Sequence, residues 1–323
     1  MYPHSQEMTP VTSEQSVPIS DVLNLSLNRY FGDWLDTQMK DDCTISHKPP
    51  HVWYGNLVTM SWWDDLWLSK GFAFFLKHKV TEDAILPRWQ VTDLFLVEQM
   101  DSAFATDAEL NSHPSVQTVN NIDEITAIFD EISYKKMFSI IRMMENSIKP
   151  TIFEKKNYLD LKMYQNPEAA YLFNILQKCS PDNLNVIAIT DTWTRQKEFS
   201  VVNVKKSGNK YILTQKRFLI DPNADFDPSE SEYGYKWTIP ITYITNKIST
   251  PTLVWFDKDA KDLVIEFDDP VEWIKFNAHE VGYYRVNYEE KEWNTLYNIL
   301  RCQHEILSAF DRAHLLENVF SLT

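Results

Sequence analysis

The sequence predicts an α+β protein of several domains, in which a mainly helical part precedes a small β-sandwich and the start of a second helical part. Apolar residues recur at helical spacing from about residue 62 to 177, and the period changes to two from Phe199 onward. A chain of 323 residues is also long for a single hydrophobic core. Together these observations favour separate helical and β domains.

Helices are predicted wherever apolar residues repeat every three or four positions. The clearest repeats are Leu66, Phe72, Phe75 and Leu76, and then Met137, Ile140, Ile141 and Met144. The second repeat extends from residue 133 to 148 and stops before Pro150, because a proline breaks a helix. Asn166-Pro167 is typical of the point where another helix begins.

Strands are predicted after Phe199, where apolar and polar residues alternate. A Ser207-Gly208-Asn209 turn separates the first two runs, so that they should form a hairpin. Clusters of Asp, Asn, Pro and Gly separate further β-rich runs at residues 237–244, 252–256, 263–267 and 283–288. Several short strands at this spacing are typical of a β-sandwich.

The chain is divided where composition or period changes. Residues 1–45 are expected to be a disordered or poorly ordered leader, because their polar, Pro-containing start buries too little to offset the entropy of ordering. Residues 46–198 should form the helical domain and residues 199–290 the β-sandwich. Residues 291–323 should begin a further helical domain, with a helix over Asp311–Leu322.

Composition excludes several classes of function. The 46 acidic and 31 basic residues give a net charge of -15, which repels nucleic acid and anionic lipid. Only 6 glycines are present, too few for Gly-rich phosphate loops. The three cysteines lie far apart and predict ordinary thiols. We expect no direct membrane span and no signal peptide, which makes the cytoplasm the default compartment.

One segment carries the most specific information. The run from His51 to Ala73 reads HVWYGNLVTMSWWDDLWLSKGFA. It closely resembles a segment of the zinc aminopeptidases of the membrane alanyl aminopeptidase type, which are gluzincins. Shorter matches occur at residues 112–114, 132–136, 191–196, 282–288 and 311–313, so that the resemblance covers roughly Ser46 to the end. It implies a thermolysin-like fold for the helical domain.

The resemblance also implies a set of site residues. In these enzymes two His and a Glu hold Zn²⁺, a second Glu is the general base, and a Tyr stabilises the oxyanion. His47 and His51 keep the two imidazole positions and Tyr134 keeps the tyrosine, but Lys48 replaces the general base and Lys70 replaces the third ligand. A protonated lysine has no lone pair for a metal or a proton, so both carboxylate functions are lost.

The backbone around the histidines also departs from the family. Pro49-Pro50 opposes a continuous helix through His47 and His51, so the two imidazoles should not share one helix face. The family's G-A-M-E-N segment, which holds the substrate's free amine, has no counterpart here, nor does the large β domain that precedes the zinc motif. On this basis the chain is identified as a degenerate and truncated member of the family.

We therefore expect a catalytically inactive homologue in which zinc is absent or weakly bound. It could bind a peptide, pair with an intact homologous aminopeptidase, or self-associate. The alternative is a residual zinc metalloaminopeptidase that removes N-terminal residues using His47, His51 and a substitute ligand. A third reading is a gene product without a selected function. Family members are often membrane-anchored ectoenzymes, which leaves the compartment open.

Simpler structural roles are also open for several residues of the motifs. Tyr134 could be a part-buried tyrosine on an amphipathic helix beside Met137 and Phe138. The tryptophan cluster at positions 62, 63 and 67 is typical of a core, and His113 should be a loop residue.

Overall fold

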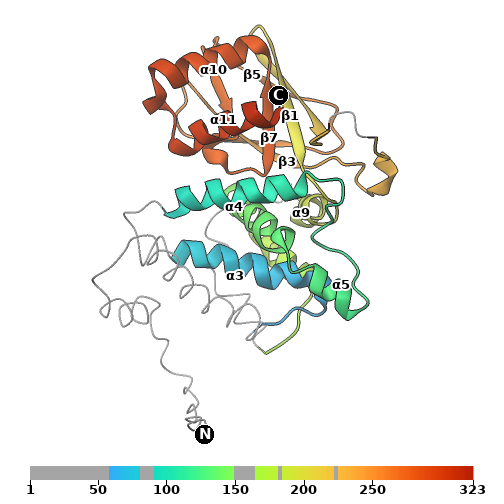
Figure 1. Ribbon diagram of the computed structural model, residues 1–323. Helices are drawn as coiled ribbons and strands as arrows, with labels where there is room; N and C mark the ends of the chain where they lie inside the picture. Colours follow the sequence, from blue (N-terminus) through green and yellow to red (C-terminus); the bar gives the residue numbers. More distant parts are fainter. Residues whose placement is uncertain (1–57, 81–90, 149–163, 181–183, 222–224, 323) are drawn as a thin grey trace, which may run out of the picture.

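The computed structural model describes residues 58–80, 91–148, 164–180, 184–221 and 225–322. Helices from the first half of the chain lie together, and the strands and the C-terminal helices lie beside them (Figure 1). The predicted leader, the His47–His51 motif and its prolines lie outside the described residues. Among the residues that are described, no helix has the length and apolar character needed to cross a bilayer.

The predicted helical half is confirmed. Its elements are η1 (Trp63–Asp65), α3 (Leu66–Val80), α4 (Val91–Asp107), α5 (Ile122–Ala127), η3 (Ile132–Lys136), α6 (Met137–Ile148), α8 (Ala169–Cys179) and α9 (Val186–Thr194). Helix α6 ends before Pro150, and α8 begins shortly after Asn166-Pro167, as the proline positions predict. The run over residues 133–148 is not one α-helix, because η3 is a π-helix that continues into α6.

The strands follow the predicted alternation. They are β1 (Ser200–Ser207), β2 (Lys210–Arg217), β3 (Ile239–Thr245), β4 (Thr252–Phe256), β5 (Leu263–Glu266), β6 (Ile274–Phe276) and β7 (Tyr284–Tyr288). One sheet has the order β5-β2-β1-β7 and the other the order β4-β3-β6. The β1–β2 hairpin turns at Gly208, whose φ of 62° suits glycine because it has no Cβ. Strand β7 closes its sheet by pairing parallel to β1.

Aromatic side chains join the two sheets. The Tyr211 ring of β2 lies 6.1 Å from the Phe276 ring of β6, and Phe276 lies 6.2 Å from Tyr288 of β7. The backbone N–H of Phe276 also donates to the Tyr288 hydroxyl at 2.8 Å. Tyr243 of β3 packs against the same cluster. Such rings bury large apolar areas, so this cluster supplies much of the core between the sheets.

The C-terminal helices pack against the sheets. Helix α10 (Glu290–Cys302) and the short η7 (His304–Ile306) precede α11 (Ala309–Leu322), close to the start and end predicted for a helix here. Ser308 caps α11, because its hydroxyl accepts from the backbone N–H of Asp311 at 3.1 Å and donates to the Asp311 carboxylate at 2.6 Å. Strand β1 begins at residue 200 and α10 at residue 290, close to the proposed domain boundaries, and the domain division itself stays a prediction.

Three buried ion pairs connect elements that are distant in sequence. Asp107 pairs with Lys136 at 2.9 Å and Lys275 with Asp311 at 2.8 Å, all four side chains being fully buried. Arg217 of β2 forms a third buried pair with Glu198. Strand β6 was not predicted, because its central Lys275 reads as a solvent-exposed residue until its partner in α11 is known.

The Asp107 carboxylate has the richest set of partners. Its Oδ1 accepts from the Ser112 hydroxyl at 2.7 Å and from the backbone N–H of Glu198 at 2.9 Å. Its Oδ2 contacts Lys136 and accepts from the Tyr283 hydroxyl at 3.2 Å. One carboxylate therefore ties the end of α4 to η3, to the segment before β1 and to the segment before β7.

Asp107→Asn should be strongly destabilising, because it leaves the buried Lys136 ammonium without a charged partner. Breaking a buried pair in this way costs about 3–5 kcal/mol. The free energy of unfolding in urea gives the measurement. Glu266→Gln is the matched control, because its pair with Lys210 is exposed on both sides and should contribute about 0–1 kcal/mol. Equal effects of the two substitutions would contradict the role assigned to Asp107.

Gly71→Ala should destabilise the protein, although alanine normally stabilises a helix by roughly 0.5–1 kcal/mol relative to glycine. A Cβ at Gly71 would lie 2.8 Å from the Met137 Cβ, so α3 and α6 would have to separate. Such overpacking costs about 1–3 kcal/mol and outweighs the gain in propensity. Thermal unfolding shows whether Gly71→Ala lowers or raises the melting temperature. Asn298→Ala is the control, because Asn298 is exposed on α10 and alanine there should improve helix propensity without overpacking. A stabilised Gly71→Ala variant would show that the helices have room to adjust.

Candidate functional site

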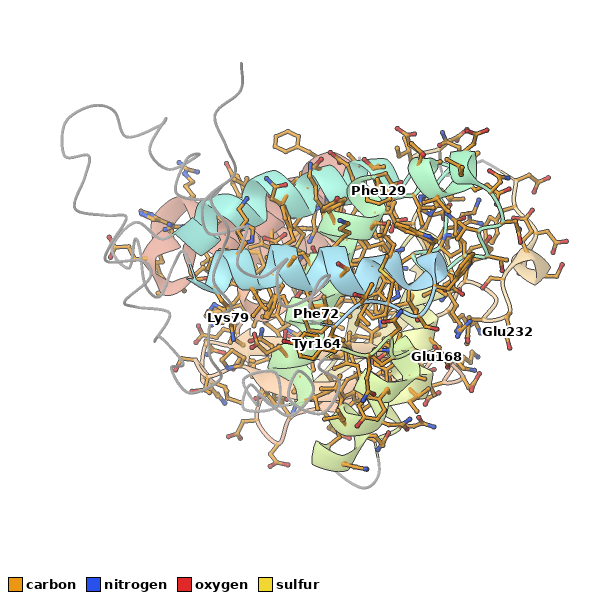
Figure 2. All side chains as sticks on the ribbon, turned by 90° about the horizontal axis from the view of Figure 1, so that it is seen from below. Phe72, Lys79, Phe129, Tyr164, Glu168 and Glu232 are labelled. Carbon is orange, nitrogen blue, oxygen red and sulfur yellow. The ribbon has the colours of Figure 1, made fainter. Side chains whose placement is uncertain are left out.

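The structure brings Lys70 and Tyr134 together, although 64 positions separate them in the sequence (134 − 70). The Lys70 ammonium nitrogen lies 6.0 Å from the centroid of the Tyr134 ring and 5.1 Å from that of Phe129. Both Lys70 and Tyr134 are half-buried. Helix α3 runs across the middle of Figure 2, with Phe129 on one side of it and Phe72 and Lys79 on the other. The site is therefore built between α3 and the segment that leads into η3.

Close packing of α3 on the following helices fixes the position of Lys70. Gly71, the next residue, lies directly against Met137, the first residue of α6. Phe72 and Phe75, which the helical pattern predicts as core residues, are both buried. Lys70 thus leaves the helix at the margin of the core, where its stem is buried and its ammonium reaches aromatic rings.

Burial changes the protonation of both residues in the same physical way, by disfavouring charge. It lowers the pKa of the Lys70 ammonium from its usual value. It raises the pKa of the Tyr134 hydroxyl, so that this group stays neutral. The ring faces of Phe129 and Tyr134 partly compensate the lysine charge through cation–π attraction.

Tyr134 lies inside the π-helix η3, and Asp130 holds the start of that helix. The Asp130 carboxylate accepts from the backbone N–H groups of Ile132 at 3.0 Å and Ser133 at 3.1 Å. π-Helical turns are rare and frequently lie at functional sites, because the extra residue shifts the register of the side chains. The π-helix could not be predicted from the sequence, since η3 and α6 share one apolar period.

His113 supports Asp130 from a neighbouring loop. Its Nε2 lies 2.7 Å from the Asp130 carboxylate and its Nδ1 lies 2.8 Å from the carbonyl oxygen of Pro114. These two oxygens only accept hydrogen bonds, so an imidazole that is protonated on both nitrogens satisfies both of them, while the Gln117 amide nitrogen lies 3.2 Å from the same Nδ1. Burial opposes this charge, but the hydrogen bonds to Asp130 and Pro114 outweigh it and raise the pKa of His113.

Glu131, in the same segment, forms an ion pair and accepts hydrogen bonds. Its carboxylate pairs with Lys135 and accepts from the Ser102 and Thr106 hydroxyls of α4. Burial disfavours the charge, but these hydrogen bonds outweigh it and lower the pKa of Glu131. Asp130 and Glu131 are thus engaged by His113 and Lys135, and among the described residues Lys70 has aromatic contacts in place of an acidic partner.

The other predicted residues can be placed only in part. His47, Lys48 and His51 lie outside the described residues, and within the described ranges no three His, Cys, Asp or Glu side chains form a group suited to a metal ion. His113 is a loop residue, as predicted, but sequence reasoning missed its ion pair with Asp130.

The expectation of a buried tryptophan cluster holds for one of its members and not for another. Trp67 is buried and stacks on Phe173 with the ring centroids 5.8 Å apart. Trp62 is 56% exposed, which corrects the prediction that the whole cluster is core. Its indole N–H donates to the carbonyl oxygen of Val119 at 3.2 Å, which satisfies the polar edge while the ring faces solvent.

Comparison with known proteins places the chain in a family. The Peptidase family M1 domain matches residues 35–193, and the ERAP1-like C-terminal domain matches residues 273–323. Glutamyl aminopeptidase of Homo sapiens is 37% identical over 290 residues, which is 88% of this chain and 30% of that protein. Aminopeptidase A of Gloydius brevicauda is 36% identical over 282 residues, 86% of this chain and 29% of that protein.

Aminopeptidase N of Bos taurus is 34% identical over 292 residues, 86% of this chain and 30% of that protein. The chain therefore spans about three tenths of the length of these curated relatives. The similarity includes the helices that carry Lys70 and Tyr134 and extends through the C-terminal helices. On these grounds the chain belongs to the membrane alanyl aminopeptidase family.

Proposed function

We propose that this chain is a non-catalytic member of the aminopeptidase family, which binds a peptide or a protein and does not hydrolyse peptide bonds. The observation that carries the proposal is Lys70. It occupies the position that corresponds to the family's third metal ligand, and its ammonium packs on Phe129 and Tyr134. The proposal covers the described part of the site together with the sequence of the His47–His51 motif.

The residues present do not fit a zinc ion. Zn²⁺ in such a centre takes a carboxylate oxygen as its third protein ligand. The Lys70 ammonium has three N–H donors and no lone pair while it is protonated. Burial lowers the pKa of Lys70, which eases loss of its proton, but the two aromatic rings favour the charged form. A cation at this position therefore opposes a second cation.

Coulomb's law gives the size of the repulsion between the Lys70 ammonium and a metal ion. Two unit charges about 4 Å apart interact by about 4 kcal/mol at an effective dielectric constant of about 20. At Lys70 an attraction between carboxylate and metal becomes a repulsion of similar size. Lys48 removes the general base in the same way, since an ammonium accepts no proton from water. Both changes act against hydrolysis, and they do so independently.

Pro49 and Pro50 are a third obstacle, which is independent of charge. In the family the two histidines lie one turn apart on a helix, and a proline within a helix costs about 3 kcal/mol. A loss of that size corresponds to about a hundredfold in affinity. Restoring only the carboxylates should therefore leave zinc binding weak, whereas restoring both carboxylates and backbone should recover it.

Zinc affinity and aminopeptidase activity should test the proposal in four proteins: the wild type, Lys48→Glu with Lys70→Glu, Pro49→Leu with Pro50→Ala, and the fourfold variant. We expect no activity of the wild type on alanyl, leucyl or glutamyl reporter substrates. Competition with a chromophoric chelator should show tight zinc binding only in the fourfold variant, about a hundredfold tighter than in the carboxylate double variant.

Two results would contradict this account in different ways. Wild-type turnover that a chelator blocks, and that follows the protein through purification, would favour the residual metalloaminopeptidase. If the carboxylate double variant binds zinc as tightly as the fourfold variant, the prolines do not distort the motif. The second result would leave the effect of the Lys48 and Lys70 charges in place. Wild-type turnover that a chelator blocks would contradict it.

A partner surface is proposed on the C-terminal helices. A groove of about 460 Å³ lies between α10 and α11, and none of its lining residues is an Asp, Glu, Lys or Arg. Tyr297, Leu316 and Phe320 in this groove are 60%, 52% and 80% exposed. The chain carries a net charge of -15, so two copies repel one another least where a surface is uncharged. We propose that a second copy of this chain occupies the groove.

Self-association should therefore be measurable by sedimentation equilibrium and should depend on Phe320. Phe320→Asp should shift the distribution to monomer, because it buries a charge in an apolar contact. Val264→Asp is the matched control, since Val264 is 49% exposed on β5, away from the groove. A wild-type protein that stays monomeric, or equal effects of the two substitutions, would contradict the proposal.

A further inference from the structure

Three carboxyl groups converge on one arginine where the helical half meets the C-terminal helix. Arg285 of β7 lies 3.7 Å from the Asp101 carboxylate of α4 and 3.3 Å from the Glu317 carboxylate of α11. Glu280, in the short helix η6 (Ala278–Glu280), is the third and is 2% exposed. We call Asp101, Glu280 and Glu317 the carboxyl cluster.

Two members of the carboxyl cluster, Asp101 and Glu317, contact the arginine directly, and the carboxyl groups also face one another. Each of the pairs Asp101–Glu317 and Glu317–Glu280 is close enough to share a proton. A carboxylate only accepts hydrogen bonds, so in a bond between two carboxyls one of them must carry a proton and donate it. A hydrogen bond within either pair therefore requires the cluster to be partly protonated.

The surrounding charges do not remove this requirement. Lys275 faces Glu280 but pairs with Asp311 at 2.8 Å. Arg142 of α6 also faces Glu280, and its guanidinium donates to the carbonyl oxygens of Glu280 and His279 at 2.6 and 3.1 Å. His314 of α11 is buried, and burial beside Lys275 and Arg285 lowers its pKa far enough to keep it neutral.

Arg285 is held in place by its neighbours, and its single positive charge is smaller than the charge of three ionised carboxylates. Its guanidinium lies 4.3 Å from the centroid of the Phe104 ring, and its side chain is 6% exposed. Its Nε has no hydrogen-bond partner among the described residues. The same is true of one carboxyl oxygen of Glu280. A single arginine in direct contact with the cluster cannot neutralise three ionised carboxylates.

Burial and mutual repulsion change the acidity of the cluster accordingly. Burial, the hydrogen bond to Glu317 and the Glu317 charge raise the pKa of Asp101 to about 7. Burial is also the main reason that the pKa of Glu280 rises to about 7, although three cations face it. The pKa of Glu317 is raised by burial and by the Glu280 charge. Each group thus keeps its proton to a higher pH than an exposed carboxyl does.

We propose that the carboxyl cluster is a proton-sensitive latch that holds α11 on α4. When the cluster holds its protons, the hydrogen bonds join Asp101 of α4 to Glu317 of α11 around Arg285. When the protons leave, like charges face each other across the same contact, and α11 loosens. A cavity of about 540 Å³, lined by Asp101, Arg285 and Glu317, opens beside the cluster and admits water to exchange the protons.

The direction of the pH dependence follows from the raised values. A carboxyl whose pKa is higher in the folded than in the unfolded state binds more protons when folded, so stability falls as pH rises. For Asp101 and Glu280 the fall lies between about 4, where the unfolded groups titrate, and about 7. The contribution is complete below this window and is lost above it. This is opposite to the behaviour of ordinary salt-bridged carboxylates.

Thermal unfolding between pH 5 and 8.5 tests the latch in the full chain. Glu317→Gln and Asp101→Asn keep the shape of a protonated carboxyl and remove its titration. We expect the wild-type melting temperature to fall across this range, and the fall to be smaller by about 2–4 °C in each variant. Glu305→Gln is the control, because Glu305 is exposed on η7, and its profile should run parallel to that of the wild type.

Hydrogen exchange provides a second, local measurement. After correction for the intrinsic pH dependence of exchange, amides of α11 in the wild type should lose protection between pH 5.5 and 8. In Glu317→Gln they should keep it. The latch is overturned if the melting profiles of wild type, Glu317→Gln and Asp101→Asn are parallel, or if α11 protection in the wild type is independent of pH. If Asp101→Asn does not fold, Glu317→Gln alone decides between these outcomes.

Discussion

The contact between Asp107 and Lys136 is the constraint on which the described structure depends most. Both side chains are fully buried, and the carboxylate also receives hydrogen bonds from Ser112, Glu198 and Tyr283. A buried charge is tolerated only when it is paired and fully hydrogen-bonded, so these partners cannot move independently. Lys136 is the last residue of η3, two positions after Tyr134. The ion pair thereby sets where the π-helix lies relative to the strands.

The buried ion pairs that stabilise the fold are separate from the contacts of the candidate site. Besides Asp107–Lys136, the buried pair Lys275–Asp311 joins α11 to β6, and the buried pair Glu198–Arg217 joins the segment before β1 to β2. Both pairs lie outside the Lys70 contacts. At the site itself, Lys70 touches ring faces, and such contacts contribute modestly at a half-buried position. A lysine at position 70 therefore leaves the largest electrostatic contacts of the scaffold in place.

Much of the fold could be predicted from the sequence because it follows from periodicity. The alternation after Phe199 identified β1, β2, β4, β5 and β7 closely, and proline positions marked the end of α6 and the start of α8. What could not be predicted depends on partners that are distant in sequence. Strand β6 contains a lysine that is buried only because Asp311 lies opposite it, and the pairing of β1 with β7 spans about eighty residues.

The candidate site divides in the same way. The exchange of a carboxylate for Lys70 is visible in the sequence, because the motif around it fixes the alignment. The aromatic contacts of Lys70 are not visible, since Phe129 lies in no periodic element. The His113–Asp130 pair could not be predicted for a similar reason, because no sequence spacing links a loop histidine to a helix-capping aspartate. Geometry thus adds the supporting residues, while the resemblance of the sequence motif predicts the changed ligand position.

The distribution of charge suggests why a site changed in this way can coexist with a stable fold. Lys70 adds a cation beside Phe129, and the carboxylates that follow Phe129 in the chain, Asp130 and Glu131, are already engaged by His113 and Lys135. A fully buried ammonium without an acidic partner would destabilise the core by several kcal/mol. Lys70 is only half-buried, so its head remains partly solvated while its stem packs against α3's neighbours. Position 70 therefore tolerates a lysine, because the side chain can keep its charge in contact with water and with the rings of Phe129 and Tyr134.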